Sequence, residues 1–155
     1  MHAFLETPVT DATAHALLAE YFAYREQTFP NAEGYVTTFP SPAAFTPPEG
    51  VFLVVELDGA SVGCGGIRSL GEGRFEIKHL WLRPSVQGRG LGRALLAELE
   101  RRAVLLGATE LVLDTNASLE AAGGLYRSSG YSDIEPYNDN PNATNWYLKR
   151  LPAAD

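Results

Sequence analysis

Residues 75–96 decide the fold, and they read FEIKHLWLRPSVQGRGLGRALL. The first eight are apolar or long-stemmed and include branched and aromatic members, which is typical of a half-buried strand. Pro84 has no backbone donor and ends that strand. From Leu91 the apolar residues recur at helical spacing, so the stretch predicts a strand, a short loop and a helix. The apolar stripe of that helix consists of Leu91, Leu95, Leu99, Ala103 and Leu106.

The loop between strand and helix, Gln87-Gly88-Arg89-Gly90-Leu91-Gly92, alternates glycine with larger residues. Because glycine has no Cβ, the chain can turn tightly there and bring bare N–H groups to a ligand. These N–H groups are the unpaired donors of a helix start, where the helix dipole also favours negative charge. Arg89 and Arg93 add positive charge beside them. The pattern predicts a phosphate cradle, and the alternative is a glycine-rich turn without a ligand.

The spacing of the glycines narrows the choice of phosphate ligand. Gly-x-Gly-x-Gly is neither the dinucleotide fingerprint Gly-x-Gly-x-x-Gly nor the P-loop, which needs Lys-Ser/Thr after its last glycine. The loop instead resembles the acetyl-CoA pyrophosphate loop of the GNAT N-acetyltransferases, Gln/Arg-x-x-Gly-x-Gly/Ala, which Gln87, Gly90 and Gly92 match. This resemblance implies acetyl-CoA as a co-substrate and no metal.

The rest of the chain predicts a single domain, residues 1–155, with strands running as hairpins and then alternating with helices. That order is the order of the GNAT acyl-CoA N-acyltransferase fold, which implies an α/β (α+β) architecture: a splayed mixed β-sheet flanked by helices. The expected strands are 2–7, 51–57, 61–69, 75–82, 110–115, 131–134 and 145–151.

Two further helices and one long loop complete the predicted order. One helix should begin at Thr10 or Asp11 and run to about residue 27, and another should run from a cap at Ser118 to about residue 128. Residues 29–50 are rich in proline and predict a loop with one short helix near 41–45. The aromatic residues of that loop form either a binding wall or a packed connector. They are Tyr35, Phe39 and Phe45.

The second half of the chain extends the resemblance. Asn116 follows the expected fifth strand, and residues 125–131 match the family's Leu-Tyr-x-x-x-Gly-Tyr/Phe motif. Residues 137–141, Tyr-Asn-Asp-Asn-Pro, resemble a bacterial subgroup that carries this segment before its last strand. One departure is Ala-Ala-Gly-Gly at 121–124, where relatives commonly have an acidic and a β-branched residue. Because two glycines weaken a helix, we expect this helix to begin late or to be mobile.

Composition excludes several classes of function. The chain has 155 residues, 45% of them hydrophobic, and a formal net charge of −7, which argues against a nucleic-acid binder and against docking on anionic lipid. The single cysteine, Cys64, favours a reducing compartment, and no signal peptide or membrane span is visible. We therefore expect a cytoplasmic protein, monomeric or homodimeric. The glycines that flank Cys64 indicate that another backbone or a ligand comes close there.

The resemblance implies a cofactor site residue by residue. In the family's splayed sheet the pantetheine arm of acetyl-CoA pairs with the fourth strand, which assigns Leu80, Trp81 and Leu82 to it. A backbone N–H near Leu80 would be the oxyanion donor. Asn116 would contact the arm from the fifth strand. The pyrophosphate would lie on Gln87, Gly88, Arg89, Gly90, Leu91, Gly92 and Arg93.

The resemblance also implies two catalytic residues. Tyr126 would protonate or hydrogen-bond the leaving thiolate, and the alternative is a tyrosine packed on the cofactor without a proton role. Glu76 would deprotonate the amine through water, and the alternative is a solvated glutamate paired with Lys78 or Arg74. His79 is the rival base, because the pKa of an ordinary histidine lies near neutrality. Strand alternation places Glu76 on the face of Leu80 and Leu82, and a bulge would change that.

The resemblance therefore implies an acetyl-CoA-dependent N-acetyltransferase that moves an acetyl group to a primary amine by direct attack in a ternary complex. The acceptor is a small molecule or a peptide N-terminus, and the acidic net charge slightly favours a cationic one. The alternative is an acyl-CoA-binding sensor or regulatory module without robust catalysis. Substrate-side candidates are Tyr24, Arg25, His79, Asp114 and Tyr137.

Overall fold

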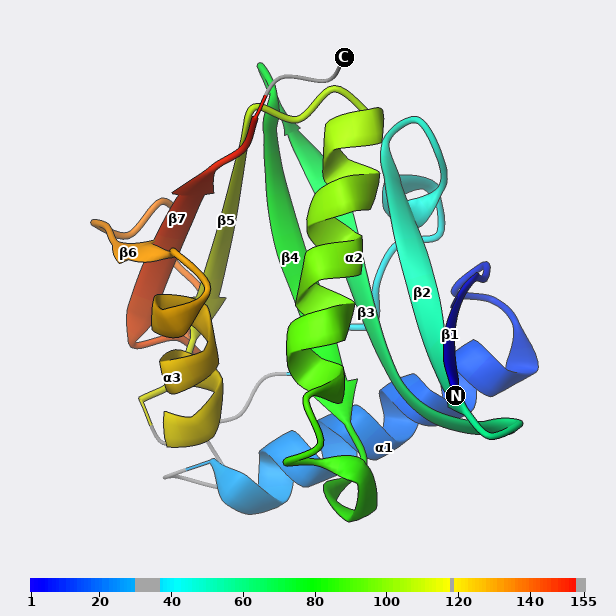
Figure 1. Cartoon of the computed structure of the whole chain (residues 1–155). Coiled ribbons are helices and arrows are strands. Elements are labelled where there is room, and N and C mark those ends of the chain that lie inside the picture. Colours follow the sequence, from blue (N-terminus) through cyan, green and yellow to red (C-terminus); the bar gives the residue numbers. More distant parts are fainter. Residues whose placement is uncertain (30–36, 118, 153–155) are drawn as a thin grey trace.

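A mixed sheet of seven strands forms the centre of the part of the chain that the computed structural model describes, residues 1–29, 37–117 and 119–152 (Figure 1). Its strands lie in the order β1-β2-β3-β4-β5-β7-β6. β4 and β5 are parallel, and the other neighbours are antiparallel. The predicted mixed sheet is therefore confirmed. The strands are β1 His2–Glu6, β2 Gly50–Leu57, β3 Ala60–Gly71, β4 Arg74–Leu82, β5 Glu110–Thr115, β6 Ser132–Asp133 and β7 Asn145–Arg150.

Helices cover both faces of the sheet. α1 (Ala12–Thr28) and the 3₁₀ turn η2 (Ala43–Phe45) pack on one face, and α2 (Leu91–Leu105) and α3 (Glu120–Ser128) pack on the other (Figure 1). A second 3₁₀ turn, η3 (Pro84–Val86), follows β4. The stripe predicted for the Leu-rich helix is the face that α2 buries, and its members Leu91, Leu95, Leu99 and Ala103 are all in the core.

β4 and β5 begin as neighbours and then separate. Their ladder joins residues 74–76 to residues 110–112. Beyond it the two strands diverge, while β4 stays paired with β3 on its other side as far as Leu82 (Figure 1). The edge of β4 that faces β5 is therefore unpaired with that strand over most of its length, which is the splay that the resemblance implies.

A β-bulge interrupts β4 and corrects one prediction. Two residues, His79 and Leu80, lie opposite a single residue of β3, and His79 has a φ of +57°. Because a bulge shifts the alternation by one residue, the strand exchanges faces there. Trp81 packs in the core on the α1 side and Leu82 in the core on the α2 side. The expectation that Glu76 shares a face with Leu80 and Leu82 is therefore wrong: it shares the α1 face with Trp81.

The glycines of β3 make room for neighbouring protein groups rather than for a ligand. A Cβ at Gly63 would lie 2.5 Å from the carbonyl oxygen of Trp81, and a Cβ at Gly66 would lie 2.8 Å from the ring of Phe45. Between them Cys64 is fully buried. The close approach predicted from sequence is thus an approach of backbone and an aromatic ring.

Local signals in the sequence placed several element ends correctly. Asp11 caps α1, since its carboxylate accepts hydrogen bonds from two backbone N–H groups of the first turn. Asp58 and Gly59 both have positive φ, as a tight hairpin turn requires. The short helix predicted near residues 41–45 is η2. Tyr35 and the predicted cap Ser118 lie outside the described residues.

The glycine pair of α3 does not delay the start of the helix. α3 begins at Glu120, so Gly123 and Gly124 lie inside it, and the predicted late start is wrong. A Cβ at Gly124 would meet no other atom within 4 Å. The helix therefore tolerates the two glycines within its packed setting, although a glycine in a helix interior costs up to about 1 kcal/mol relative to alanine.

We expect Gly124→Ala to raise the free energy of unfolding by about 0.5–1 kcal/mol, because the new methyl group fits and the unfolded chain loses freedom. Chemical denaturation measures this change. Gly107→Ala is the matched control: its site is equally open, but its φ of +95° penalises any side chain, so we expect a loss of stability. A Gly124→Ala protein less stable than the parent would contradict this reading of α3.

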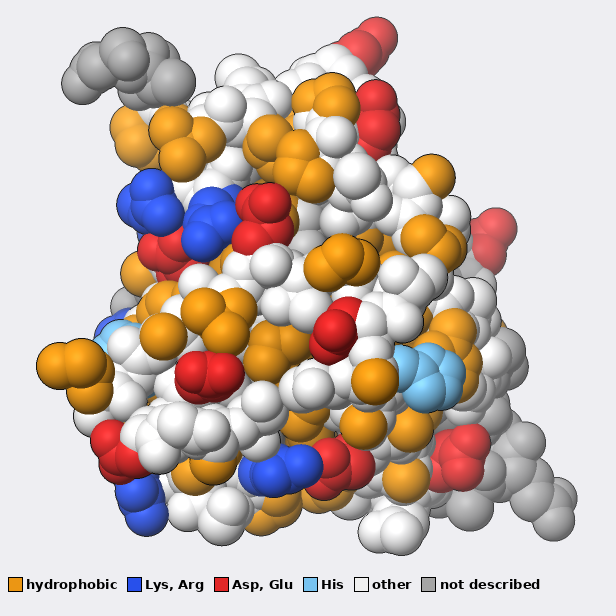
Figure 2. Space-filling model, turned by 90° about the vertical axis from the view of Figure 1, so that its right-hand side faces the viewer, with side chains coloured by type: hydrophobic (Ala, Val, Ile, Leu, Met, Phe, Trp, Pro, Cys, Tyr) orange, Lys and Arg blue, Asp and Glu red, His pale blue; other side chains and the backbone are white. Residues whose placement is uncertain are grey.

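The surface near β1 and β2 carries charges of both signs, interspersed with small groups of apolar side chains (Figure 2). Among the described helices, none has the length and apolar character needed to cross a bilayer.

Candidate active site

A cavity of about 930 Å³ lies where β4 and β5 separate. It runs from the glycine loop and the start of α2 to α1 and the segment 38–45. Most of the predicted site residues line it. Those on its wall are Tyr24, Arg25, His79, Leu80, Trp81, Leu82, Gln87, Gly88, Gly90, Gly92, Arg93, Asp114 and Tyr126. The predicted residues that are not among its lining residues are Glu76, Arg89, Leu91, Asn116 and Tyr137.

The glycine loop has the backbone that its sequence predicts. Gly88 and Gly90 have φ values of +79° and +80°, a conformation that residues with a Cβ rarely adopt. A Cβ at either position would meet no other atom within 4 Å, so open space lies beside both. Gly90 is the N-cap of α2, whose first N–H groups have no acceptor within the helix. This end of the cavity fits a pyrophosphate by charge, by space and by hydrogen-bonding capacity.

Side chains fix the loop from two directions. The amide of Gln87 donates to the carbonyl oxygen of Leu82 at 2.8 Å, which ties the loop to the end of β4. Arg93 donates to the hydroxyls of Ser128 and Ser129 at 2.8 and 3.1 Å, which ties the start of α2 to the end of α3. The side chain of Leu91 is buried in the core instead of facing the cavity.

Tyr126 of α3 lies on the cavity wall with its side chain buried. The rings of Tyr131 and Tyr147 pack against it, each with its centroid 5.9 Å away. Burial raises the pKa of Tyr126, and the negative charge of Asp114 raises this pKa further. The phenol therefore keeps its proton throughout the neutral pH range and can act as a hydrogen-bond donor.

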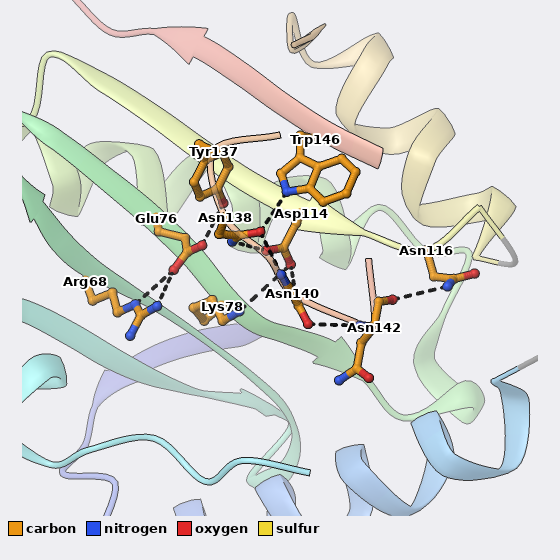
Figure 3. A network of polar contacts seen from close by, with 10 residues as sticks. All are labelled: Arg68, Glu76, Lys78, Asp114, Asn116, Tyr137, Asn138, Asn140, Asn142 and Trp146. Carbon is orange, nitrogen blue, oxygen red and sulfur yellow. Dashed lines mark hydrogen bonds and ion pairs between the residues drawn. The ribbon is translucent and has the colours of Figure 1, made fainter. Parts of the chain in front are cut away.

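Glu76 belongs to a polar network with Arg68 and Tyr137 (Figure 3) and is not itself a lining residue of the cavity. Its side chain is 1% exposed. Nε and a terminal nitrogen of Arg68 each lie 2.9 Å from Oε1, and the hydroxyl of Tyr137 donates to Oε2 at 2.6 Å. Burial, and then the charge of Glu76, raise the pKa of Tyr137. Glu76 is thus not a solvated surface residue: it joins β3, β4 and the segment before β7.

His79 lies among aromatic rings at the bulge of β4. The rings of Phe22, Phe45 and Tyr21 have centroids 5.5–5.9 Å from its own. Burial lowers the pKa of His79 to about 3, and the positive charges of Lys78 and Arg68 act in the same direction. The imidazole is therefore neutral at pH 7 and is a weak proton acceptor.

Asp114 of β5 organises the segment that precedes β7 (Figure 3). Its Oδ2 accepts a hydrogen bond from the amide of Asn138 at 2.7 Å, and its Oδ1 accepts one from the amide of Asn140 at 3.0 Å. The indole nitrogen of Trp146 donates to Asn138 at 2.9 Å. The ammonium group of Lys78 is 3.9 Å from Oδ1. Asp114 therefore fixes one rim of the cavity.

Asn116 lies at the end of the same network rather than on the large cavity. Its side-chain amide donates to the backbone carbonyl oxygen of Asn142 at 3.1 Å. It is buried and lines a separate small cavity with Thr115, Gly123 and Tyr147.

The wall includes residues to which the sequence assigned no role in the site, among them Arg68, Lys78, Asn138 and Asn140. The two asparagines had a usable signal, since asparagine at every second position, 138, 140 and 142, favours side-chain-to-backbone turns. The backbone N–H of each following asparagine does bond the preceding side-chain oxygen, at 3.2 and 3.0 Å. Arg68 had no local signal, because its place on the wall depends on the pairing of β3 with β4.

Cys64 is buried, and burial raises the pKa of its thiol. A thiol of this kind is a poor nucleophile. Within the described ranges, no group of three or more His, Cys, Asp or Glu side chains could hold a metal ion.

Comparison with known proteins places the chain in a family. Residues 11–131 match the Acetyltransferase (GNAT) family. The chain belongs to this family and is an acyltransferase that transfers acetyl groups.

Named relatives agree with this assignment. An IAA acetyltransferase of Azospirillum brasilense is 31% identical over 133 residues, which cover 85% of this chain and 84% of the relative. An uncharacterised N-acetyltransferase of Schizosaccharomyces pombe is 36% identical over 107 residues, which cover 68% of this chain and 66% of the relative.

Solved structures share the fold. A protein of Klebsiella pneumoniae described as an acyl-CoA N-acyltransferase has a TM-score of 0.78 and 29% identity, covering 97% of this chain and 98% of the other. An acetyltransferase of Salmonella typhimurium, whose structure contains acetyl-CoA, has a TM-score of 0.70 and 16% identity, covering 100% of this chain and 96% of the other. The predicted GNAT fold is confirmed.

Proposed function

We propose that this protein transfers an acetyl group from acetyl-CoA to a primary amine of a small molecule or a peptide N-terminus. The observation that carries the proposal is one continuous cavity. It joins the glycine loop at the N-terminus of α2 to the unpaired edge of β4. It then continues into an aromatic chamber beside α1, which is lined by Tyr21, Phe22 and Phe39. A neighbour of the same fold binds acetyl-CoA, which supports the choice of co-substrate.

Different groups of the chain serve different steps of the proposed acetyl transfer. The N–H groups at Leu91–Arg93, with Arg93 beside them, hold the pyrophosphate. The backbone of β4 from Leu80 to Leu82 pairs with the pantetheine arm, and an N–H near Leu80 stabilises the oxyanion. Tyr126 donates a hydrogen bond to the sulfur as negative charge develops there. Its raised pKa suits hydrogen-bond donation better than complete proton transfer.

We favour direct attack in a ternary complex over an acetyl-enzyme intermediate. Cys64, the single cysteine, is a poor nucleophile for such an intermediate, because it is buried and its thiol pKa is raised. We expect initial rates of thiol release, with acetyl-CoA and a primary amine both varied, to give intersecting reciprocal plots. Parallel plots, or an acetylated protein seen by mass spectrometry, would contradict direct attack. Acetyl-CoA binding without thiol release on any amine would favour the sensor alternative.

We assign Glu76 a positioning role, since its two oxygens already bind Arg68 and Tyr137 and it is not on the cavity wall. The alternative is the base role that the resemblance implies for Glu76. His79 is the weaker candidate, because a base with a pKa of about 3 accepts protons poorly at pH 7. If neither residue is the base, the acceptor amine must lose its proton before it binds. We therefore expect the rate of acetyl transfer to rise with pH as the free amine is deprotonated.

We expect Glu76→Gln to lower kcat by about tenfold, through loosened positions of Arg68 and Tyr137, while kcat/KM still rises with pH as in the parent. A glutamine can still accept from Arg68 through its oxygen and can donate from its amide nitrogen to the Tyr137 hydroxyl, so the fold survives. Glu110→Gln is the control, since Glu110 also pairs with an arginine of a neighbouring strand, Arg74 at 3.2 Å. Loss of the rising pH dependence in Glu76→Gln would restore Glu76 as the base.

A cytoplasmic location and a monomeric or homodimeric state are part of the same proposal; the single buried cysteine supports the former.

A further inference from the structure

The charged side chains that line the cavity are mostly basic, whereas the protein as a whole is acidic. The chain carries a net charge of −7. Among the described residues that line the cavity, however, the basic side chains are Arg25, Arg68, Lys78 and Arg93, and the acidic one is Asp114. Arg93 lies at the phosphate end. The other three lie on α1, β3 and β4, outside the glycine loop.

Arg68 and Lys78 are too far along the sheet to serve the pyrophosphate. The glycine loop is tied to Leu82, at the end of β4. Lys78 lies four residues before Leu82, which is about 13 Å of strand, and Arg68 faces Glu76, about 20 Å away. Their positive charges therefore act at the acceptor end of the cavity.

Glu76 holds Arg68 in place, and both Arg68 and Lys78 keep N–H donors to spare. Glu76 accepts two donors of Arg68 through one oxygen, whereas a guanidinium has five N–H groups. Arg68 is 41% exposed and lies on the wall. Lys78 is 22% exposed, and its distance of 3.9 Å from Asp114 is too long for a hydrogen bond. Figure 3 shows Arg68, Lys78 and Asp114 in one row across β3, β4 and β5.

Two cations on one wall of a cavity suit an anionic ligand group. A fork of guanidinium N–H groups beside an ammonium group suits a carboxylate, and charge-assisted hydrogen bonds of this kind are the strong ones. The opposite side of the chamber is apolar and aromatic, with Tyr21, Phe22 and Phe39 on the wall. A purely cationic amine would meet like charge here, whatever the net charge of the protein.

We propose that the acceptor is an amine that also carries a carboxylate, such as an amino acid with an aromatic or apolar side chain, and that Lys78 and Arg68 bind this carboxylate. The inference rests on the proposed amine acetylation and names its substrate class. It replaces the slight preference for a cationic acceptor that the acidic composition favours.

The first test compares L-phenylalanine with 2-phenylethylamine, which differ only by the carboxylate. We expect kcat/KM, calculated per free amine, to be at least about tenfold higher for L-phenylalanine. In Lys78→Gln this advantage should disappear, with the rate on 2-phenylethylamine changed less than about threefold. Arg68→Lys, which keeps the charge beside Glu76, should reduce the advantage in part. Arg101→Gln, on the solvent side of α2, is the control and should change neither rate.

The second test needs no turnover. Phenylacetate is titrated into the protein with CoA present, and quenching of tryptophan fluorescence reports binding, since Trp81 lines the cavity. We expect saturable binding that weakens at least tenfold in Lys78→Gln but not in Arg101→Gln. Equal rates on the two amines, or an advantage that survives in Lys78→Gln, would overturn the carboxylate site while leaving acetyl transfer intact. Phenylacetate binding that depends on Lys78, without turnover of any amine, would support the site and refute the proposed transfer.

Discussion

Gly90→Asp is expected to weaken acetyl-CoA binding by at least about 100-fold. The substitution places a carboxylate at the N-cap of α2, where the pyrophosphate is proposed to lie. Two like charges about 4 Å apart repel by about 4 kcal/mol near a protein surface, and salt reduces this value. Isothermal titration calorimetry measures the loss directly.

The matched control is Gly90→Asn, which has the same size and no charge. Asparagine and aspartate are the non-glycine residues that best tolerate the φ of +80° found at Gly90, and both are good N-caps. A Cβ there meets no other atom within 4 Å, so neither variant should unfold the protein. We expect Gly90→Asn to bind within about tenfold of the parent. Equal affinity of parent and Gly90→Asp would remove the glycine loop from the cofactor site.

Tyr126→Phe is expected to lower kcat about 100-fold while the Kd of acetyl-CoA changes less than about threefold. The variant keeps the ring that packs between Tyr131 and Tyr147 and removes only the hydroxyl. A preorganised donor to a negative charge that develops in the transition state typically contributes about 10²–10³-fold. Because its pKa is raised, Tyr126 should contribute no limb to the pH profile between pH 6 and 9.

Tyr131→Phe makes the same chemical change one ring away. Its hydroxyl donates to Glu100 at 2.9 Å, and neither residue lines the cavity. We expect this control to lose some stability and to keep kcat within about threefold. If Tyr126→Phe turned over at the parental rate, the tyrosine would be a packing residue and the thiolate would need another donor.

Much of the fold could be predicted because its signals are local. The change from strand to helical spacing in residues 75–96, the cap at Asp11 and the turn at Asp58-Gly59 each depend on a few adjacent residues. The two predictions about the fold that were wrong, the face of Glu76 and the start of α3, depend on contacts between distant parts of the chain. The bulge at His79 depends on how β4 pairs with β3, and α3 starts early because tertiary packing offsets the poor helix propensity of Gly123 and Gly124.

In the candidate site, too, the features with local signals could be predicted and those that depend on tertiary structure could not. The phosphate end is built from one continuous loop, so its residues could be predicted together from sequence. The acceptor end draws Arg25, Arg68, Lys78 and Asn140 from four separate segments, and no spacing rule connects them. His79 also differs from the expectation because of burial. The sequence indicates a histidine with a pKa near neutrality, whereas burial among aromatic rings lowers this pKa to about 3 and keeps the imidazole uncharged.

The most direct test of the proposed function is a calorimetric titration of the parent protein with acetyl-CoA, followed in the same cell by L-phenylalanine and a thiol reagent. We expect one saturable acetyl-CoA site per chain and release of one thiol per acetylated amine. Absence of saturable acetyl-CoA binding would contradict the assignment of the glycine loop and, with it, the proposed function.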